Sequence, residues 1–377
     1  MIINYPDKKS YAEITSDIDK FSLVASSPDD NEANNMLVFG DNYHALKALS
    51  NTHRGKIDLV YIDPPFATNN NFTIGETRVS TISSSKQDKV AYSDVLTEEK
   101  YLEFLRERLL LLRDLLSENG SIYLHIDYKI GHYVKVIMDE IFGINNFKND
   151  ITRIKCNPKN FHRKAYGNIK DMILFYSKTE NHIWNKVEEQ ISQDDLKKLY
   201  KKVDKNGNYY TTIPLHAPGE SNGDTGQVWR GMQPPIGRHW RTSPTTLELW
   251  DKDGLIEWSK TGNPRKIVYL NPEKGKKIQD IWEFKDTQRP CYPTEKNLSM
   301  LERIILNSSN FNSIVLDCFC GSGTTLVAAE LHGRKWIGID QSLEAIKVTK
   351  TKLQNVNAAY SESEVLYCQK LRENALT

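Results

Sequence analysis

The chain lacks long apolar runs, paired cysteines and an excess of charge of one sign. No apolar stretch approaches the ~20 residues needed to span a bilayer, so the sequence predicts no membrane helix. The N-terminus has no basic region followed by a long apolar one, which argues against a secretory signal and leads us to expect a cytoplasmic protein. Fifty basic against 49 acidic side chains give a net charge of +1, which neither predicts nor excludes a polyanionic partner.

The cysteines and the length limit the architecture further. Five cysteines without CxxC spacing favour free thiols in a reducing compartment, with neither a disulfide frame nor a metal site. A chain of 377 residues, 39% hydrophobic and 26% charged, is typical of a globular protein with one large domain and a smaller one.

Short apolar strands alternate with amphipathic helices near both ends of the chain. The pattern predicts strands at 35–39, 57–62, 121–126, 151–155, 172–177, 314–317 and 335–339. It predicts helices at 43–49, 97–116 (ended by Gly120), 298–306 and from residues 324 and 341. From about 180 to 285 this rhythm gives way to sequence rich in Pro, Gly and Trp. We therefore expect an α/β fold in three segments, 1–180, 181–285 and 286–377, the middle one a separate domain.

The first candidate site is the tract 57–66, in which an apolar run ends in Asp63-Pro64-Pro65-Phe66. Two prolines cannot extend a strand, so Asp63 should lie at the carboxyl end of a buried parallel strand, where open α/β sheets bind their ligands. The alternative is a strand-ending turn packed by an aromatic residue, the usual reading of an isolated Pro-Pro pair.

The second candidate site is the tract 314–325, where a strand ends at Asp317 and a glycine-containing turn follows. Gly321 and Gly323 allow backbone amides to approach a nucleotide-like ligand, and Asp340, after the next strand, is placed to accept ribose hydroxyls. Taken alone the turn is also compatible with tight packing. A nicotinamide dehydrogenase would need a third glycine or alanine where Leu326 stands, and it leaves Asp63 unexplained.

Together the Asp317-x-Phe319-x-Gly321-x-Gly323-Thr324 turn and the Asp63-Pro64-Pro65-Phe66 tetrapeptide resemble the two signatures of amino-methylating DNA methyltransferases. The tracts 40–42 and 293–296 match further segments of that family, although Asn297 stands where the family usually has proline. The motif order looks like the β class, and the resemblance covers the chain outside 181–285. It implies a class I, Rossmann-like sheet that is circularly permuted, with an inserted target-recognition domain.

The chemistry of this family explains the tetrapeptide. An exocyclic adenine amine is a poor nucleophile because its lone pair is delocalised into the ring. Asp63 and the Pro64 carbonyl can accept the two amine hydrogens and localise that pair. Proline, here Pro64 and Pro65, offers a carbonyl without a competing N–H, and Phe66 offers a flat face for an extruded base.

The resemblance also implies which residues bind S-adenosylmethionine and DNA. The expected cofactor residues are Asp41, Asp63, Lys296, Asp317, Phe319, Cys320, Gly321, Ser322, Gly323, Thr324 and Asp340. The candidate DNA contacts are basic residues of the acid-free segment 155–170 and of the middle domain: Lys155, Lys159, Arg163, Lys164, Arg238 and Arg241. The polar stretch 67–93 is expected to be a mobile loop that covers the site. Most of the tryptophans at 229, 240, 250, 258 and 282 should form the core of the recognition region, and His44, His125 and His132 are expected to be packed or on the surface.

The sequence therefore predicts a site-specific DNA methyltransferase of a restriction-modification system, acting on adenine N6 in duplex DNA by base flipping, in a prokaryote or phage. Expected partners are double-stranded DNA, a second copy of the chain and a cognate restriction endonuclease, with S-adenosylmethionine as cofactor and no metal. Two alternatives stay open. One is a cytosine-N4 methyltransferase, although such enzymes tend to carry serine in place of Asp63; the other is a non-catalytic DNA-binding subunit with the same fold. Cys291, which follows Pro290, lacks the context of a cytosine-C5 nucleophile and is read as structural.

Overall fold

The structure is a computed structural model of the chain. It describes residues 2–25, 35–65, 71–74, 79–80, 89–93, 98–158, 164–189, 196, 198–260, 262–271, 275–287, 290, 292–293 and 295–367. These residues divide into two compact units, Met1–Val187 with Gln279–Thr377, and Glu188–Ile278. Within the described residues no helix is long and apolar enough to cross a membrane.

The first unit is built on one mixed sheet. In spatial order its described strands are β1 (Phe21–Ala25), β21 (Ser361–Tyr367), β2 (Met36–Phe39), β20 (Lys335–Asp340), β19 (Ile314–Asp317), β3 (Ile57–Ile62), β7 (Leu116–Ile126), β9 (Lys170–Ser177), β8 (Phe147–Ile154) and β18 (Ile281–Glu283). Neighbours from β21 to β7 run parallel, whereas β9 is antiparallel to both β7 and β8. The central parallel strands are largely apolar, as expected for a sheet that is covered on both faces.

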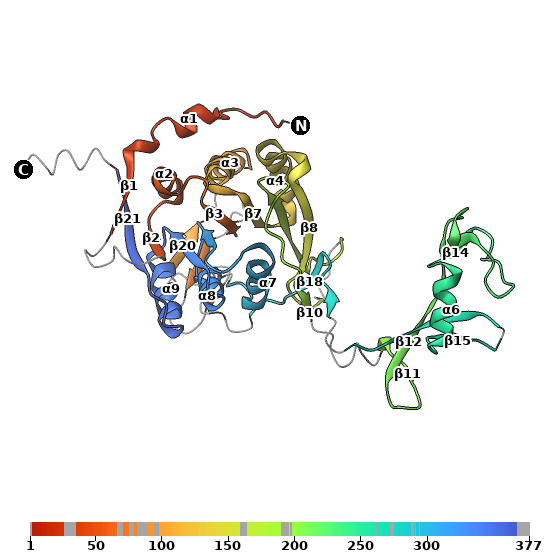
Figure 1. Cartoon of the computed structure of the whole chain (residues 1–377). Coiled ribbons are helices and arrows are strands. Elements are labelled where there is room, and N and C mark those ends of the chain that lie inside the picture. The colour runs from red at the N-terminus through yellow and green to blue at the C-terminus, as the bar shows by residue number, and fades with distance from the viewer. Residues whose placement is uncertain are drawn as a thin grey trace, which may run out of the picture. The chain divides into compact units, whose positions relative to one another are not determined.

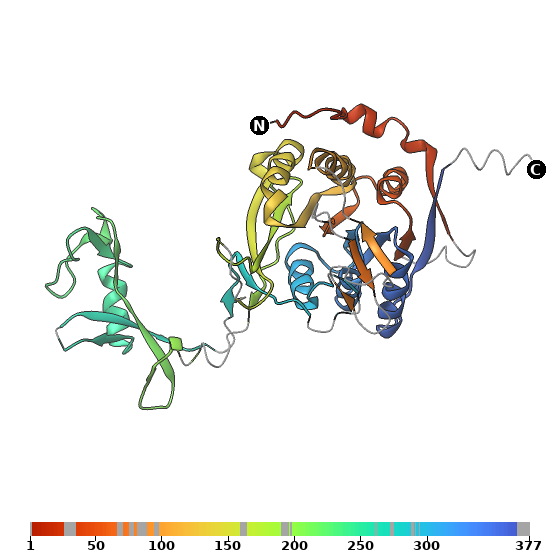
Figure 2. The same ribbon diagram turned by 180° about the vertical axis from the view of Figure 1, so that it is seen from behind.

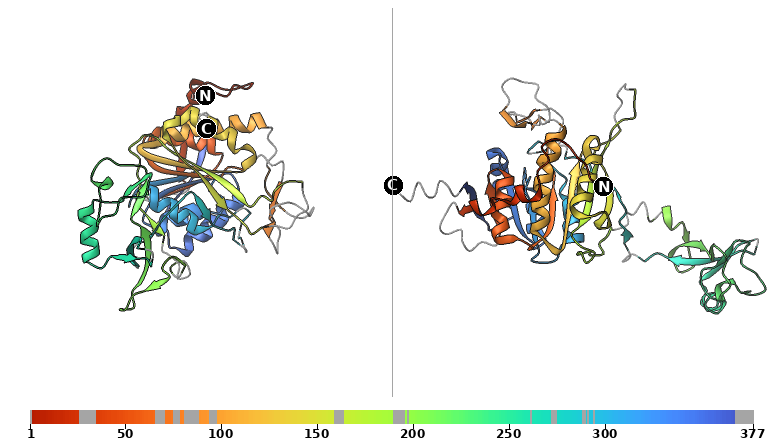
Figure 3. Two further views of the ribbon diagram at one scale, coloured as in Figure 1. Left: turned by 90° about the vertical axis from the view of Figure 1, so that its right-hand side faces the viewer. Right: turned by 90° about the horizontal axis from the view of Figure 1, so that it is seen from above.

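Helices lie on both faces of this sheet (Figures 1 and 3). One layer contains α2 (Asn42–His53), α3 (Glu98–Leu115) and α4 (Tyr128–Phe142), and the other contains α7 (Leu298–Ser308), α8 (Thr324–Leu331) and α9 (Leu343–Asn355). Short helical turns are α1 (Tyr11–Thr15), η1 (Ile18–Lys20) and η3 (Ile144–Asn146). The core between sheet and helices includes fully buried Val60, Leu316 and Leu109. This is the α/β architecture of the class I sheet that the sequence predicts.

Each predicted strand and helix of the first unit has a counterpart, whereas α4, β1, β18 and β21 were not predicted. The boundary between α3 and β7 differs from the prediction. Helix α3 ends at Leu115 rather than at Gly120, because β7 begins at Leu116. Gly120 therefore lies inside the strand, where a Cβ would stand 2.9 Å from the carbonyl oxygen of Ile57. The β3–β7 register shifts between Ile57 and Leu59, and a glycine inside a strand often marks such an irregularity.

The stretch 67–93 contains strands of its own. Its described parts are β4 (Asn71–Ile74), β5 (Val79–Ser80) and β6 (Lys89–Ser93), which form a small sheet apart from the large one (orange in Figure 2). The sequence predicts a mobile loop over the whole stretch, and for these described residues the structure has strands instead. Its expected role as a cover of the site stays a prediction.

The second unit has its own sheets and core. Its four-stranded sheet contains β11 (Lys202–Val203), β12 (Tyr209–Pro214), β16 (Pro264–Tyr269) and β15 (Ile256–Trp258). Two-stranded pairs are β13 (His216–Pro218) with β14 (Arg238–Trp240), and β10 (Glu188–Glu189) with β17 (Lys276–Lys277); η4 (Asp224–Gly226) and helix α6 (Pro244–Lys252) complete the unit. Trp229 and Trp240 are buried in its core with Leu247, and Trp250 packs against it. Trp282, in contrast, lies on β18 of the first unit, so its placement in the recognition region's core is wrong.

Candidate active site

Four acidic residues follow neighbouring parallel strands of the large sheet. Asp63 follows β3, Asp317 ends β19, Asp340 ends β20, and Asp41 stands two residues beyond β2. Strands β3 and β19 pair directly, with Leu59 opposite Val315. Because the carboxyl ends of parallel strands meet at one edge of a sheet, the aspartate-proline corner and the glycine turn lie side by side.

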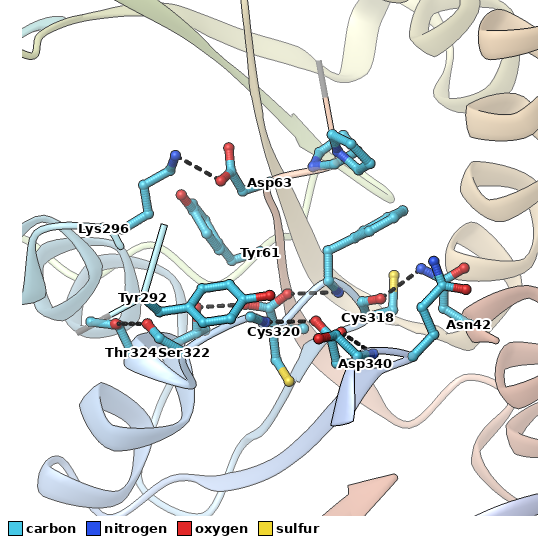
Figure 4. Close-up of a pocket in the computed structure, with 18 of the residues that line it drawn as sticks. Asn42, Tyr61, Asp63, Tyr292, Lys296, Cys318, Cys320, Ser322, Thr324 and Asp340 are labelled. Carbon is cyan, nitrogen blue, oxygen red and sulfur yellow. Dashed lines mark hydrogen bonds and ion pairs between the residues drawn. The ribbon is translucent and has the colours of Figure 1, made fainter. Parts of the chain in front are cut away.

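A cavity of about 560 Å³ opens between these corners, a volume within the usual range for small-molecule sites. Figure 4 shows the cavity in close-up, with residues that line it drawn as sticks. Its wall includes Asp41, Asn42, Tyr61, Asp63, Pro64, Pro65, Phe104, Tyr292, Lys296, Asp317, Phe319, Cys320, Gly321, Ser322, Thr324 and Asp340. All the predicted cofactor residues except Gly323 therefore line one cavity, and Gly323 lies in the same turn.

The glycine turn needs its glycines for two different reasons. Gly321 and Gly323 have φ angles of 51° and 72°, a region that residues with a Cβ rarely adopt. At Gly323 a Cβ would also stand 2.6 Å from Cγ2 of Thr349 on α9. The turn thus packs tightly against α9, while α8 begins directly after Gly323.

The side chains of Asp317 and Asp340 fix the glycine turn through hydrogen bonds. One Asp317 oxygen accepts from the Phe319 amide at 3.0 Å, and the other accepts from the Thr325 hydroxyl at 2.6 Å. Asp340 accepts from the Gly321 amide at 2.9 Å and so ties β20 to the turn. Burial raises the pKa of Asp317 to about 7 despite these hydrogen bonds, and burial also raises the pKa of Asp340.

Asp41 has a structural partner as well as a place on the cavity wall. Its side chain caps α2 by accepting from the amides of Tyr43 and His44. The next residue, Asn42, donates from Nδ2 to the Cys318 carbonyl at 2.7 Å. These contacts fasten the N-terminus of α2 to the glycine turn. Cys318 and Cys320 are buried there, and burial raises the pKa of both thiols well above the usual range.

At the other end of the cavity Asp63 pairs with Lys296. The Lys296 ammonium lies 2.7 Å from Asp63 Oδ2, whereas Asp63 Oδ1 is buried and has no hydrogen-bond partner within the described part of the chain. Lys296 immediately precedes Asn297, whose side chain caps α7 by accepting from the Met300 amide at 3.2 Å. Asn297, at the position where the resemblance leads us to expect proline, therefore caps the helix that begins directly after Lys296.

Sequence reasoning missed the polar residues behind Asp63. His125 is fully buried on β7, with Nδ1 4.0 Å from Asp63 Oδ1 and 3.0 Å from the Tyr61 hydroxyl. Its Nε2 lies 3.1 Å from Asp171 Oδ2. Burial and the charge of Lys296 lower the pKa of His125, although Asp171 and Asp63 act in the opposite sense. Tyr61 was open to prediction, because strand alternation places it on the same face as Asp63.

Other side chains in or beside the cavity fall outside the predicted site residues. Lys352 of α9 donates to the hydroxyls of Ser322 and Thr324 at 3.1 and 3.3 Å and pairs with Glu295. The ring of Tyr292 lies beside Gly321, and Phe104 of α3 faces Phe319 at 6.1 Å between ring centroids. No group of His, Cys, Asp and Glu side chains among the described residues is arranged to hold a metal ion.

The remaining predicted residues lie elsewhere. Phe66, Lys159, Arg163 and Cys291 fall outside the described residues. Lys155 pairs with Asp171 at 2.6 Å, and Lys164 is exposed. In the second unit Arg238 and Arg241 are exposed on or beside β14. As DNA contacts these residues stay predictions.

The chain is similar to a family model, to other proteins in sequence and to solved structures. The family model described as DNA methylase matches residues 57–351. The Type II methyltransferase M.EcaI of Enterobacter cloacae is 42% identical over 355 residues, covering 92% of this chain and 76% of that protein. The Type III restriction-modification enzyme StyLTI Mod subunit of Salmonella typhimurium is 25% identical, and the match covers 84% of this chain and about half (52%) of that protein. Among solved structures, the M1.HpyAVI–SAM complex aligns with a TM-score of 0.46 at 18% identity, over 84% of this chain and 98% of that one.

Proposed function

The chain belongs to the DNA methylase family of N6 and N4 amino-methyltransferases, and we propose that it transfers a methyl group from S-adenosylmethionine to the N6 amine of adenine in duplex DNA. The observation that carries the proposal is Asp63 Oδ1, a buried carboxylate oxygen without a hydrogen-bond partner among the described residues, at the wall of the cavity. Buried acceptors are normally satisfied. An amine hydrogen of the substrate base would satisfy this one.

The cavity suits S-adenosylmethionine, which supplies an electrophilic methyl group on a sulfonium. The cofactor is positively charged at the sulfonium and at the ammonium, and Asp41 puts a carboxylate on the cavity wall. The turn from Asp317 to Thr324 is proposed to cradle the methionine part, and Asp340 is proposed to accept the ribose hydroxyls. The turn at Gly321 lets its backbone approach a bound molecule without a Cβ in the way. Phe319 and Phe104 offer apolar faces for an adenine ring.

Asp63 and Pro64 act on the substrate amine. Lys296 occupies Oδ2 of Asp63, so the carboxylate is held in one orientation with Oδ1 available to accept an amine hydrogen. The Pro64 carbonyl can accept the other hydrogen, and Pro65 has no N–H to compete for it. With both hydrogens engaged, the nitrogen's lone pair is directed out of the ring plane toward the methyl group.

Adenine is the proposed base because Asp63 is a carboxylate. Cytosine-N4 methylation is the alternative for the same cavity, since both amines need two acceptors. In either case the amine lies inside the duplex, so we propose that the target base is flipped into the cavity. Phe66 is the proposed stacking partner.

The second unit, Glu188–Ile278, is the proposed target-recognition domain. Its exposed Arg238 and Arg241 are suited to phosphate or base-edge contacts. Ile236, in the same segment, is fully exposed and is placed to contact a groove. A cognate restriction endonuclease is a proposed partner, supported by the restriction-modification name of the StyLTI Mod subunit. A second copy of the chain is proposed as a further partner.

The test is product analysis after incubation of the purified chain with radiolabelled S-adenosylmethionine and unmodified genomic DNA. We expect N6-methyldeoxyadenosine after digestion to nucleosides. Detection of N4-methyldeoxycytidine instead would show that the target base is cytosine. No incorporation of label on any DNA would favour a non-catalytic DNA-binding subunit. Asp63→Ala should abolish transfer while cofactor binding, measured by calorimetry, persists. Asp150→Ala, at an exposed position of β8, is the matched control and should transfer normally.

A further inference from the structure

A row of polar side chains crosses the sheet behind Asp63, on one face of four neighbouring strands. Tyr61 and Asp63 belong to β3 and the residue after it, His125 to β7, Asp171 to β9 and Arg153 to β8. Arg153 and Asp171 are direct cross-strand partners. The side chains of His125, Asp171 and Arg153 are 0%, 4% and 1% exposed. A buried polar row of this kind is costly unless every member is paired, which raises the question of what it does.

The hydrogen bonds of the row fix the protonation state of His125. Burial favours the neutral form of Asp171, but the hydrogen bond from His125 and the charges of Lys155 and Lys296 outweigh it and lower the pKa of this carboxyl. Asp171 is therefore an ionised acceptor, and Nε2 of His125 must carry the hydrogen between them. Because burial lowers the pKa of His125, we assign the neutral ring. Its Nδ1 is then a lone-pair acceptor, and the Tyr61 hydroxyl, 3.0 Å away, is assigned as the donor.

The basic atom of His125 thus faces the corner where the proposed reaction releases a proton. Transfer forms an N–C bond from the nitrogen's lone pair and breaks the C–S bond, whose electron pair stays on sulfur. The methylated nitrogen is left with one proton too many. Asp63 Oδ1 is the first acceptor, and His125 Nδ1 lies 4.0 Å beyond it. That separation exceeds a hydrogen bond, but such contacts in free enzymes commonly shorten when substrate binds.

We propose that His125 and Asp171 form a proton-accepting pair behind Asp63. The proton released by the methylated amine passes from Asp63 Oδ1 to His125 Nδ1, and the Tyr61 hydroxyl gives up its hydrogen bond to that nitrogen as the proton arrives. This rests on the proposed methyl transfer. The imidazolium that forms donates from Nε2 to the Asp171 carboxylate, so the positive charge is compensated where it appears. Asp63 returns to its ionised form and retains its ion pair with Lys296. After the product base withdraws, the proton returns to Asp63, which lines the cavity, and leaves from there to solvent.

The charges around His125 agree with this role. Asp63 faces it from the end of β3 and Asp171 from β9, both negative, while Lys296 faces it from the segment before α7. Arg153 contacts Asp171 Oδ2, the same oxygen that His125 contacts, and is itself bound to Asp286 and to the Phe284 carbonyl. Lys155 holds the second Asp171 oxygen. The carboxylate that supports His125 is therefore fixed in position from three sides.

The test measures the single-turnover rate of methyl transfer at saturating cofactor and DNA between pH 5 and 9. Wild-type rates should fall toward acid as His125 takes up a proton. His125→Asn should slow transfer by roughly 10²-fold or more, and its rate should no longer fall at acid pH. Its dissociation constants for cofactor and DNA should stay within about threefold of wild type. If that variant melts at a much lower temperature, His125→Gln, whose amide can still donate to Asp171, replaces it.

Two controls separate this role from a structural one. Tyr61→Phe removes the hydroxyl bound to Nδ1 but leaves His125 as the proton acceptor, so the rate of this variant should still fall at acid pH. If the rate of Tyr61→Phe no longer fell at acid pH, the role of His125 would be to hold Tyr61, and the proposal would be overturned. His132→Asn, at an exposed position of α4, should change nothing. A His125→Asn enzyme with wild-type rate and pH profile would also overturn it. Failure of the wild-type chain to transfer methyl groups would instead refute the proposed function.

Discussion

The Lys296 ammonium lies 2.7 Å from Asp63 Oδ2 and joins the segment before α7 to the corner after β3. The two side chains are only 11% and 15% exposed. A carboxylate in such a place needs a compensating charge, and the contact with Oδ2 leaves the other oxygen to the cavity. Lys296, expected among the cofactor residues, thus also contacts the residue proposed to act on the substrate amine.

Loss of this cation should impair transfer more than cofactor binding. Lys296→Met keeps the length and apolar stem of the side chain but leaves the Asp63 carboxylate uncompensated and free to rotate. We expect the single-turnover rate to fall by about 10- to 100-fold, a loss of roughly 1.4 to 2.7 kcal/mol in transition-state stabilisation. Lys347→Met, at a position 58% exposed on α9, is the control. Equal rates for the two variants would show that the ion pair is dispensable.

Asp317 predicts how stability depends on pH. Its pKa is raised to about 7, chiefly by burial, from the usual value near 4. Between these values the folded state binds one proton more than the unfolded state, so this group makes the free energy of unfolding decrease as pH rises from about 4 to about 7. The effect is on the order of a few kcal/mol.

Asp317→Asn cannot titrate and removes this contribution. In urea unfolding of the cofactor-free protein, the stability of the variant relative to wild type should increase from pH 5 to pH 7.5 and then level off. Taking the difference at each pH cancels the other titrating groups. A difference that stays constant over this range would mean that Asp317 is already ionised at pH 5.

Local motifs explain why much of the site was predictable. Asp63 with its prolines and Asp317 with its glycines each end a strand within a few residues, and parallel strands bring such ends to one edge. His125 and Asp171 are different, because only the antiparallel register of β7 and β9 brings them together. The tracts 122–126 of β7 and 172–176 of β9 are almost continuously apolar, so they carry no alternation that would reveal this register.

The second unit shows a related limit. Its strands are short and several are half exposed. The alternation of apolar and polar residues therefore indicates neither the order of these strands in the sheet nor where each begins and ends. Tryptophan content did predict Trp229 and Trp240 as core residues. Trp282 was misplaced because the chain re-enters the large sheet at β18, in parallel with β8, and nothing in the tract 281–283 distinguishes an edge strand of one unit from a strand of the other.

The glycine turn should tolerate a side chain less well than other turns. Gly323→Ala combines a φ of 72° with a Cβ 2.6 Å from Thr349, and Thr349 in turn donates to the Gly321 carbonyl at 2.9 Å. Gly262→Ala has a similar φ of 77° but nothing within 4 Å, so it should cost only the backbone strain of about 1–2 kcal/mol. We expect Gly323→Ala to be less stable than this control and to bind S-adenosylmethionine at least about tenfold more weakly, as measured by calorimetry and thermal melting. Matching affinities in the two variants would remove the turn from the cofactor site.

The two units should be separable by one substitution in the core of the second. Leu247 and Leu249 lie on the same helix, α6, with exposed fractions of 0% and 55%. Leu247→Ala should cost about 2–5 kcal/mol of that unit's stability, and Leu249→Ala should stay within about 0.5 kcal/mol of wild type. Because Trp229, Trp240 and Trp250 surround Leu247, tryptophan fluorescence would follow unfolding of this unit. The cavity lies wholly in the first unit, so cofactor affinity should survive in Leu247→Ala while methylation of DNA falls. Intact methylation with an unfolded second unit would show that target recognition resides elsewhere in the chain.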